Sequence, residues 1–269
     1  MPVLFVGGCM RSGTTLVQRL LCAAPGMSPV IAECQYLTAL LAAQQRGEAD
    51  FDLFMRDYFE TPAEFDAFGR ETLRRFLAET AARCGKPICL VLKNPELAFH
   101  FSRLARLLPE ARFVLVVRDP RDVIASILTV AERHRAAGRE SHLTAMGRDM
   151  AQLSNFMLSY YADPYSHVPL LHGRLHVIRY EDAVRRDPAA LEGLMRFVGR
   201  PIEGRLADLA GEGWHCQRED SYAGAFWSAG WTEGASEQSI GSYRRRLSEA
   251  EVAAIERDCG KFGRRFRYW

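Results

Sequence analysis

A glycine-rich loop near the start of the chain constrains the fold more than any other segment. Its sequence is GGCMRSGTTL, residues 7–16, and it follows a short apolar run at residues 3–6. Gly8 and Gly13 have the G-x-x-x-x-G spacing of loops in which a strand, a turn and a helix N-terminus direct backbone N–H groups at one phosphate. Thr14 stands where a nucleotide kinase carries its lysine. The loop therefore predicts an anion site and argues against a kinase, with an ordinary glycine turn before a helix as the alternative.

Three further apolar runs predict that the strand before this loop belongs to a parallel sheet. They span residues 88–92, 113–117 and 175–178, and are short and rich in branched side chains, as strands covered on both faces are. Helix signals occur at residues 14–23, 61–85, 95–108, 187–197 and from 248 onward. Thr61 and Ser248 each begin a capping box. The alternation predicts an α/β fold of three layers, in which helices flank a parallel sheet.

The length of the chain, 269 residues, suits one domain from residue 1 to 269. Residues 203–238 differ from the rest because they are rich in Gly and Trp and have no clear period, which predicts a long loop or lid. The large aromatic residues of this segment could line a substrate pocket or pack within the lid; they are Trp214, Phe226, Trp227 and Trp231.

Composition argues against several classes of partner. The net charge is +2, from 35 basic and 33 acidic side chains, so no strong overall field favours nucleic acid. The seven cysteines are an odd number without metal-ligand spacing, and we expect reduced thiols and no metal. No signal peptide and no run of about 18 apolar residues is visible, so we expect a cytoplasmic protein without membrane contact. Nothing in the sequence indicates an oligomeric state.

Polar side chains follow the other predicted strands, at the sheet edge where parallel α/β folds bind ligands. Arg118 follows the third run and Ser126 lies in the next helix, where a guanidinium and a hydroxyl could hold a second phosphate. Lys93 directly follows the second run. Tyr180 follows the fourth run and could cover a base. A surface ion pair with a neighbouring aspartate is the alternative for Arg118.

Taken together, these segments resemble the family of sulfotransferases that use 3′-phosphoadenosine-5′-phosphosulfate (PAPS). FVGGCMRSGTTL resembles the family's 5′-phosphosulfate loop, and FVLVVRDPRDVIASI resembles its 3′-phosphate motif. LKNP, IRYEDAVRRDP and SIGSYRRRL occur in the family's usual order. The resemblance covers residues 2–202 and 236–269, and the RSGTTL form of the loop is closer to the protein-tyrosine and bacterial branches. It implies a P-loop-like sulfotransferase fold and a transfer that needs no metal.

The resemblance also implies which residues bind the nucleotide. The residues that would hold the 5′-phosphosulfate are Arg11, Ser12, Gly13, Thr14 and Thr15. Those that would hold the 3′-phosphate are Arg118 and Ser126, and Tyr180 would lie near the adenine. The residues that would complete the nucleotide site from the late segment are Ser239 and Arg244. The product would be 3′-phosphoadenosine-5′-phosphate (PAP).

The resemblance implies three catalytic residues as well. Lys93 would stabilise the bridging oxygen of the leaving group, and Arg11 the charge on the departing phosphate. The Lys-x-His of the cytosolic steroid and phenol enzymes is missing, because position 95 is Pro. The tyrosine-sulfating branch uses a glutamate after the loop helix as base, and Glu33 is the only carboxylate between residues 11 and 48. An exposed helix-cap carboxylate is the alternative for Glu33, and the other candidate bases are His134, His142 and His215.

These observations predict a sulfotransferase that moves a sulfuryl group from PAPS to a small-molecule alcohol or phenol. The acceptor oxygen, the sulfur and the leaving oxygen would be held in line, so that positioning and fixed charges supply much of the rate. Three alternatives stay open: a P-loop small-molecule kinase that uses ATP and Mg²⁺, tyrosine sulfation of a peptide or protein, and a nucleotide-binding protein without catalysis.

Overall fold

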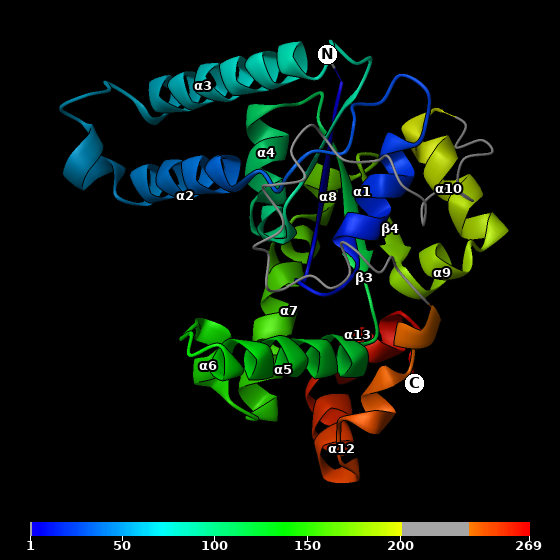
Figure 1. Cartoon of the computed structure of the whole chain (residues 1–269). Coiled ribbons are helices and arrows are strands. Elements are labelled where there is room, and N and C mark those ends of the chain that lie inside the picture. Colours follow the sequence, from blue (N-terminus) through cyan, green and yellow to red (C-terminus); the bar gives the residue numbers. More distant parts are fainter. Residues whose placement is uncertain (1, 201–236) are drawn as a thin grey trace.

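The computed structural model describes residues 2–200 and 237–269. At its centre lies a parallel sheet of four strands in the order β2-β1-β3-β4 (Figure 1). The strands are β1 (Val3–Gly8), β2 (Leu90–Lys93), β3 (Arg112–Val117) and β4 (Leu175–Arg179). All four predicted strands are confirmed, although β2 begins two residues later than expected, after an exposed Ile88. The predicted loop or lid at 203–238 lies outside the described residues, apart from its last two positions.

Two apolar clusters on opposite faces of the sheet make the three predicted layers. Val3 and Phe5 of β1 point into one cluster, and Leu4 and Val6 into the other, as the period-two alternation of a strand requires. The helices that cover the Leu4 face are α1 (Thr14–Cys22), α9 (Tyr180–Arg185) and α10 (Pro188–Val198). The main helices on the Val3 face are α2 (Gln35–Ala49), α3 (Pro62–Arg83), α4 (Phe101–Leu107), α5 (Pro120–Ala136), α7 (Met150–Ser166), α12 (Glu249–Asp258) and α13 (Gly260–Arg265).

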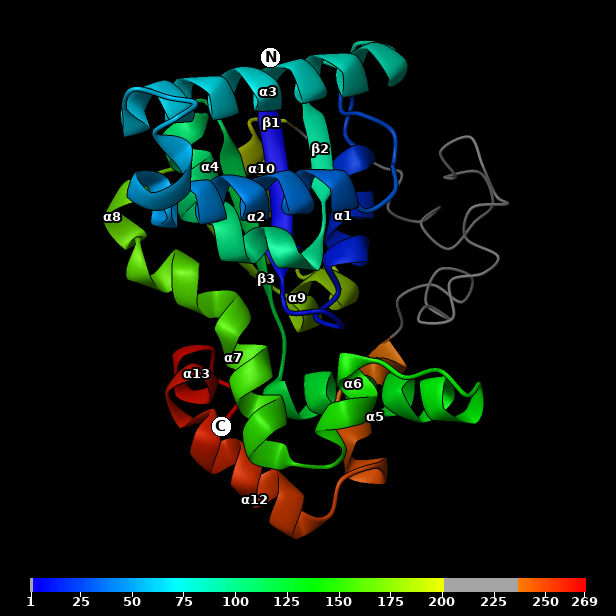
Figure 2. The ribbon, with the colours of Figure 1, turned by 90° about the vertical axis from the view of Figure 1, so that its left-hand side faces the viewer.

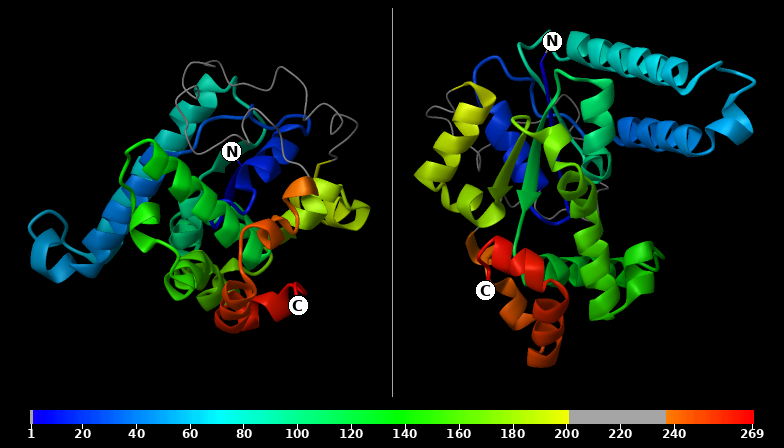
Figure 3. Two further views of the ribbon diagram at one scale, coloured as in Figure 1. Left: turned by 60° about the horizontal axis from the view of Figure 1, so that its bottom comes forward. Right: turned by 180° about the vertical axis from the view of Figure 1, so that it is seen from behind.

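Shorter elements connect these layers. They are η1 (Phe51–Met55), η2 (Pro95–His100), α6 (His142–Met146), α8 (Val168–Leu171), η5 (Glu237–Ser239) and η6 (Ser242–Arg245). Helices α2 and α3, joined by η1, form an arm that extends away from the sheet (Figures 1 and 3). Figure 2 shows that α5, α6 and the C-terminal helices gather below the carboxyl end of β3. The arm begins directly after Glu33, so one of the candidate catalytic residues lies at its base.

The helix termini follow the predicted capping signals with one difference. Ser248 and Glu251 form a reciprocal capping box before α12, as expected. At α3, the Thr61 side chain accepts a hydrogen bond from the Glu64 N–H, but the Glu64 carboxylate accepts from the N–H of Glu60 instead of that of Thr61. The hydrogen bond from the Glu64 N–H to the Thr61 side chain is therefore present, and the reciprocal hydrogen bond is made one residue earlier, by the N–H of Glu60.

The prediction of one helix from 95 to 108 is wrong, because the segment divides at Phe101. Residues 95–100 form the 3₁₀ helix η2, and α4 follows it. The backbone of η2 packs directly on β1, where a Cβ on Gly7 would lie 2.7 Å from the N atom of Ala98. A 3₁₀ helix is wound more tightly than an α-helix, which allows its backbone to pack this close to β1. The Asn94 side chain caps η2 by accepting a hydrogen bond from the Glu96 N–H.

None of the helices in residues 2–200 and 237–269 combines the length and apolar character that crossing a membrane requires.

Candidate functional site

The loop after β1 has the backbone shape of an anion cradle. Gly8 and Gly13 have φ values of 145° and 96°, and Arg11 between them has a φ of 67°. A Cβ on Gly8 would lie 2.4 Å from the carbonyl oxygen of Val116, and one on Gly13 would lie 2.2 Å from a ring carbon of Tyr180. Gly13 is the N-cap of α1 and has no side chain to cap the helix. The first N–H groups of α1 are therefore left to another acceptor, as in phosphate loops.

Two arginines from different elements meet at this loop. Arg11 Nε donates a hydrogen bond to Ser126 Oγ on α5 at 3.0 Å, and Arg118 Nη1 donates to the carbonyl oxygen of Arg11 at 3.0 Å. Burial lowers the pKa of Arg11, and the positive charges of Arg118 and Arg133 lower it further. Arginine stays protonated in proteins, so this cost remains as repulsion between cations. A bound anion would relieve it, and the electrostatics of the loop therefore favour a negatively charged ligand.

Lys93 and Glu33 form an ion pair at the neighbouring strand end. Lys93 is the last residue of β2, and the N–H of Cys34 donates to its carbonyl oxygen at 3.1 Å, which holds Glu33 close by. The Lys93 Nζ and Glu33 Oε1 atoms lie 2.7 Å apart; the lysine side chain is fully buried and the glutamate side chain is 27% exposed. Burial lowers the pKa of Lys93, and the Glu33 carboxylate opposes that shift.

Glu33 is a partly exposed carboxylate that contacts Lys93. Its carboxylate faces Lys93 and does not cap α2, whose N-cap is Cys34, so the helix-cap alternative is wrong. Its negative charge also raises the pKa of Arg11, against the larger lowering by burial and by the charges of Arg118 and Arg133. The histidines lie elsewhere: His134 Nδ1 lies 3.0 Å from Ser141 Oγ, and His142 is exposed on α6. His215 lies outside the described residues.

Tyr180 and Ser239 complete a second group of contacts around Arg118. The Arg118 guanidinium lies 4.4 Å from the centre of the Tyr180 ring, and its Nη2 donates to the carbonyl oxygen of Ser239 at 2.7 Å. The hydroxyls of Tyr180 and Ser239 lie 2.7 Å apart. Arg244 is exposed, and its guanidinium lies 4.9 Å from the centre of the Tyr243 ring. Ser239 is therefore in direct contact with Arg118 and Tyr180, two of the other predicted nucleotide residues. The Arg244 guanidinium instead lies beside the ring of the adjacent residue, Tyr243.

Most predicted site residues thus converge at the carboxyl ends of the strands. The predicted residues that share contacts around the loop are Arg11, Gly13, Arg118, Ser126, Tyr180 and Ser239. The remaining loop residues are Ser12 and Thr14, which are buried, and Thr15, which is half-buried. Among residues 2–200 and 237–269, no three or more His, Cys, Asp or Glu side chains are grouped as metal ligands would be.

Sequence reasoning missed Tyr161, which joins the loop after β1 to the end of β3. Its hydroxyl accepts a hydrogen bond from the N–H of Cys9 in the loop at 3.3 Å and donates to the carbonyl oxygen of Val116 in β3 at 3.2 Å. The side chain comes from α7 and is buried. Its position in a helix more than forty residues after β3 gave no local signal, since aromatic residues on an apolar helix face are usually core.

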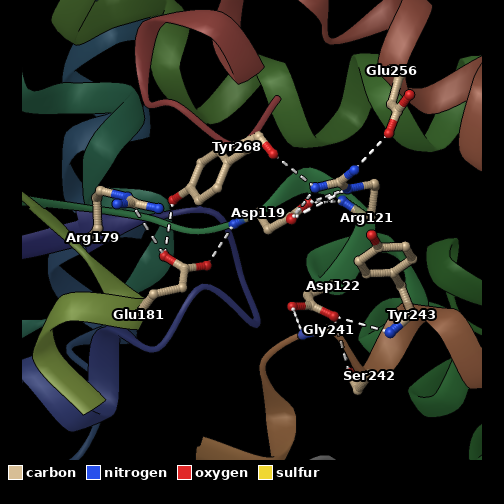
Figure 4. A network of polar contacts seen from close by, with 10 residues as sticks. All are labelled: Asp119, Arg121, Asp122, Arg179, Glu181, Gly241, Ser242, Tyr243, Glu256 and Tyr268. Atoms are coloured by element: carbon tan, nitrogen blue, oxygen red, sulfur yellow. Dashed lines mark hydrogen bonds and ion pairs between the residues drawn. The ribbon is translucent and has the colours of Figure 1, made fainter. Parts of the chain in front are cut away.

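The two aspartates after Arg118 have partners other than that arginine (Figure 4). Asp119 Oδ2 accepts from Arg121 Nη2 at 2.7 Å, and Asp122 accepts from donors at residues 241–243. The ion-pair alternative for Arg118 is therefore wrong. Burial alone would lower the pKa of Arg121, but the hydrogen bonds and charge of Asp119 outweigh it and raise that pKa.

Glu181 ties the ends of β3 and β4 to the C-terminus (Figure 4). Its Oε1 accepts from the N–H of Asp119, and its Oε2 accepts from the hydroxyl of Tyr268, each at 3.0 Å. Burial raises the pKa of Glu181, although these hydrogen bonds and the charge of Arg179 oppose the shift. Sequence reasoning missed this network because its partners lie 62 to 87 residues apart in the chain.

Comparisons with known proteins identify the family of the chain. The sulfotransferase family profile matches residues 2–204. Protein-tyrosine sulfotransferase 1 of Mus musculus is 32% identical over 130 residues, which are 48% of this chain and 34% of that protein. Omega-hydroxy-beta-dihydromenaquinone-9 sulfotransferase of Mycobacterium bovis is 29% identical over 143 residues, which are 51% of this chain and 35% of that protein. The chain thus spans about a third of the length of these curated relatives.

A solved structure shares the fold over nearly the whole chain. The sulfotransferase domain of the Synechococcus olefin synthase superposes with a TM-score of 0.57 at 17% identity and covers 95% of this chain and 94% of that one. This likeness concerns the fold alone. Since the family profile also matches about three quarters of the sequence, the chain belongs to the sulfotransferase family.

Proposed function

We propose that the protein transfers a sulfuryl group from PAPS to the hydroxyl of an acceptor. The observation that carries this proposal is the 2.7 Å pair of Lys93 and Glu33, a buried cation and a partly exposed carboxylate, next to a loop built for an anion. A transfer between two oxygen atoms needs a group that takes the proton of the attacking oxygen and a group that stabilises the leaving oxygen. Glu33 and Lys93 have these two properties.

The nucleotide would lie across the carboxyl ends of β1 and β3. The 5′-phosphosulfate would be held by Arg11, Ser12, Gly13, Thr14 and Thr15, and the 3′-phosphate by Arg118 and Ser126. Support comes from the uncapped N-terminus of α1 and from the repulsion between Arg11 and its cationic neighbours, which an anion would relieve. Tyr180 would lie near the adenine, with Ser239 and Arg244 beside it.

The reaction would be a single in-line displacement at sulfur. As the acceptor oxygen forms its bond to sulfur, its proton passes to the Glu33 carboxylate. The bond between sulfur and the bridging oxygen breaks, and the negative charge that develops on PAP is stabilised by Lys93 and Arg11. The buried Lys93 is well suited to this task because fixed charges act more strongly in a site that excludes water. The products would be a sulfate ester and PAP.

For the acceptor, we propose a small-molecule alcohol or phenol. The relatives include one named for protein tyrosine and one named for a menaquinone derivative, so both carry a hydroxyl acceptor in their names. Two segments have no counterpart in the family motifs: the α2–α3 arm, which would contribute to the acceptor side, and the loop predicted at 203–238, which lies outside the described residues apart from its last two positions. Tyrosine sulfation of a peptide is therefore an outcome that the experiment must distinguish. A cytoplasmic location and a single domain from 1 to 269 stay predictions.

The test is a transfer assay with ³⁵S-labelled PAPS in the presence of EDTA. Separate reactions contain small alcohols, phenols and a tyrosine peptide, and a parallel series contains ATP labelled at the γ-phosphate with Mg²⁺. We expect a labelled sulfate ester and an equal amount of PAP from a small-molecule acceptor. Label in the peptide alone would favour protein tyrosine sulfation. Phosphate transfer without sulfate transfer would show a kinase and contradict the proposal.

A further inference from the structure

The carboxylate of Asp122 has an arrangement that the roles described so far do not use. Asp122 lies in the first turn of α5 and is fully buried. Its Oδ2 accepts from the N–H of Gly241 at 2.8 Å, and its Oδ1 accepts from the hydroxyl of Ser242 at 3.1 Å and from the N–H of Tyr243 at 3.0 Å (Figure 4). All three donors belong to one short segment about 120 residues later in the chain.

These hydrogen bonds hold that segment against the nucleotide side of the site. Gly241 follows Ser239 by two residues, and Ser239 is the residue whose carbonyl oxygen and hydroxyl contact Arg118 and Tyr180. The N-terminus of α5 also favours the negative charge of Asp122, because the helix dipole is positive there. Asp122 therefore fixes where Ser239 lies, and through Ser239 it fixes one side of the Arg118 guanidinium.

We propose that Asp122 is a positioning residue for the nucleotide, which orients Arg118 toward the 3′-phosphate by holding residues 239–243 in place. The inference rests on the proposed function, since it assumes that the ligand carries a 3′-phosphate. Asp122 does not touch the ligand in this account. Its effect is larger on the contribution of the 3′-phosphate, which Arg118 would hold, than on that of the adenine, which Tyr180 and Ser239 would adjoin.

The rest of the late segment is held by other contacts, so the loss of Asp122 is expected to act locally. The Arg121 guanidinium lies 4.6 Å from the centre of the Tyr243 ring. Arg148 Nη2 donates to the carbonyl oxygen of Arg246 at 3.1 Å, and Arg246 Nη1 lies 3.0 Å from Glu132 Oε2. These contacts keep residues 243–246 on α5 and on the turn between α6 and α7 when the hydrogen bonds at 241 and 242 are weakened.

The experiment measures the affinity of the full chain for PAP and for adenosine 5′-monophosphate, which lacks the 3′-phosphate, by titration calorimetry. Asp122→Asn keeps the shape of the side chain but turns an amide NH₂ toward an N–H or O–H donor. We expect PAP affinity to fall roughly tenfold or more, as for a lost hydrogen bond to a charged group, while affinity for the monophosphate changes less than about threefold. Ser242→Ala removes a single donor and should shift the ratio in the same direction by a smaller factor.

Asp149→Asn is the matched control, since Asp149 accepts hydrogen bonds from two N–H groups and one side-chain amide at the start of α7, far from the nucleotide. This variant should leave the ratio of the two affinities unchanged. If both Asp122→Asn and Ser242→Ala keep the wild-type ratio, or if Asp122→Asn lowers both affinities equally, the positioning role is wrong. If the wild-type protein itself does not prefer PAP to the monophosphate, the proposed nucleotide is wrong instead.

Discussion

The two sides of the candidate site are built differently. On the nucleotide side, each charged group has several fixed partners: Arg118 donates to two carbonyl oxygens, Asp122 accepts from three donors, and Arg121 contacts Asp119, Glu256 and the Tyr268 carbonyl. On the reaction side, Lys93 forms an ion pair with Glu33, whose carboxylate is partly exposed and also accepts a hydrogen bond from Gln35 Nε2 at 3.4 Å. We infer that the nucleotide side is preorganised, whereas the reaction side keeps a pair that can exchange its contact for the acceptor and the leaving oxygen.

This difference separates the expected effects of substitutions. Changes on the reaction side should lower turnover and leave nucleotide affinity nearly intact, because the affected groups act on the atoms that change bonds. Changes on the nucleotide side should lower affinity first.

The largest effect is expected from Glu33→Gln. Without a proton acceptor the turnover number should fall roughly 10²–10⁴-fold, as for the loss of a general base, while the Kd for PAP changes little. Steady-state kinetics with PAPS and titration with PAP measure the two quantities. Glu192→Gln is the control, because its side chain is 66% exposed on α10 and far from β2. Unchanged turnover in Glu33→Gln would assign the base to another residue.

Lys93→Met should reduce turnover roughly 10²–10³-fold, the cost of removing a group that stabilises charge in the transition state. Methionine has a similar length and suits the buried position, so the fold should persist. The same kinetic assay measures the effect, with Lys261→Met on the exposed face of α13 as control. An equal loss in PAP affinity and turnover would place Lys93 on the nucleotide side and remove the distinction drawn here.

Acid should destabilise the folded protein through His100, which is the last residue of η2, the helix that follows Lys93 and Asn94. Burial and, to a smaller extent, the positive charge of Arg103 lower the pKa of His100 to about 4, whereas the negative charge of Asp163 acts to raise that pKa. The unfolded chain, with a histidine pKa near 6.5, takes up its proton first as the pH falls. The contribution of His100 to the free energy of unfolding is therefore complete above about pH 6.5. It decreases as the pH falls from 6.5 to 4, and about 3 kcal/mol of it is lost at pH 4.

Urea unfolding of the wild type and of His100→Gln between pH 7 and 4 checks this contribution. The loss of stability on acidification should be smaller in the variant by about 3 kcal/mol. Parallel curves for the two proteins would show that His100 takes up its proton as readily in the folded state as in the unfolded chain.

Arg118→Ala should have the smallest effect of the four and should act on affinity. Loss of a charge-assisted contact to the 3′-phosphate is expected to weaken PAP binding by about 1.5–3 kcal/mol. Titration with PAP measures it, and Arg196→Ala, 75% exposed on α10, serves as the control. A Kd that does not change would remove Arg118 from the 3′-phosphate site and leave it as a link between the loop and Ser239.

The sequence predicted those parts of the fold and site that depend on short-range signals. Lys93, Arg118 and Tyr180 follow apolar runs directly, and residues at the carboxyl ends of parallel strands share one edge of the sheet. Glu33 was found through the family resemblance, and its contact with Lys93 supports that choice.

The parts that the sequence did not predict depend on distant partners or on backbone packing. Asp122 is adjacent to the predicted motif, but its function is visible only from the donors at 241–243. Tyr161 reaches the loop from a helix whose pattern indicates ordinary core packing. The division of the segment 95–108 follows from the close approach of Gly7 and Ala98, which no periodicity reveals.

The most direct test of the central claim is titration calorimetry of the wild-type protein with PAP in EDTA and, separately, with ATP and Mg²⁺. We expect PAP to bind at one site, with a Kd at least tenfold lower than that of ATP with Mg²⁺, since we propose that Arg118 holds a 3′-phosphate and the loop lacks the kinase lysine. Tighter binding of ATP with Mg²⁺ than of PAP would contradict it.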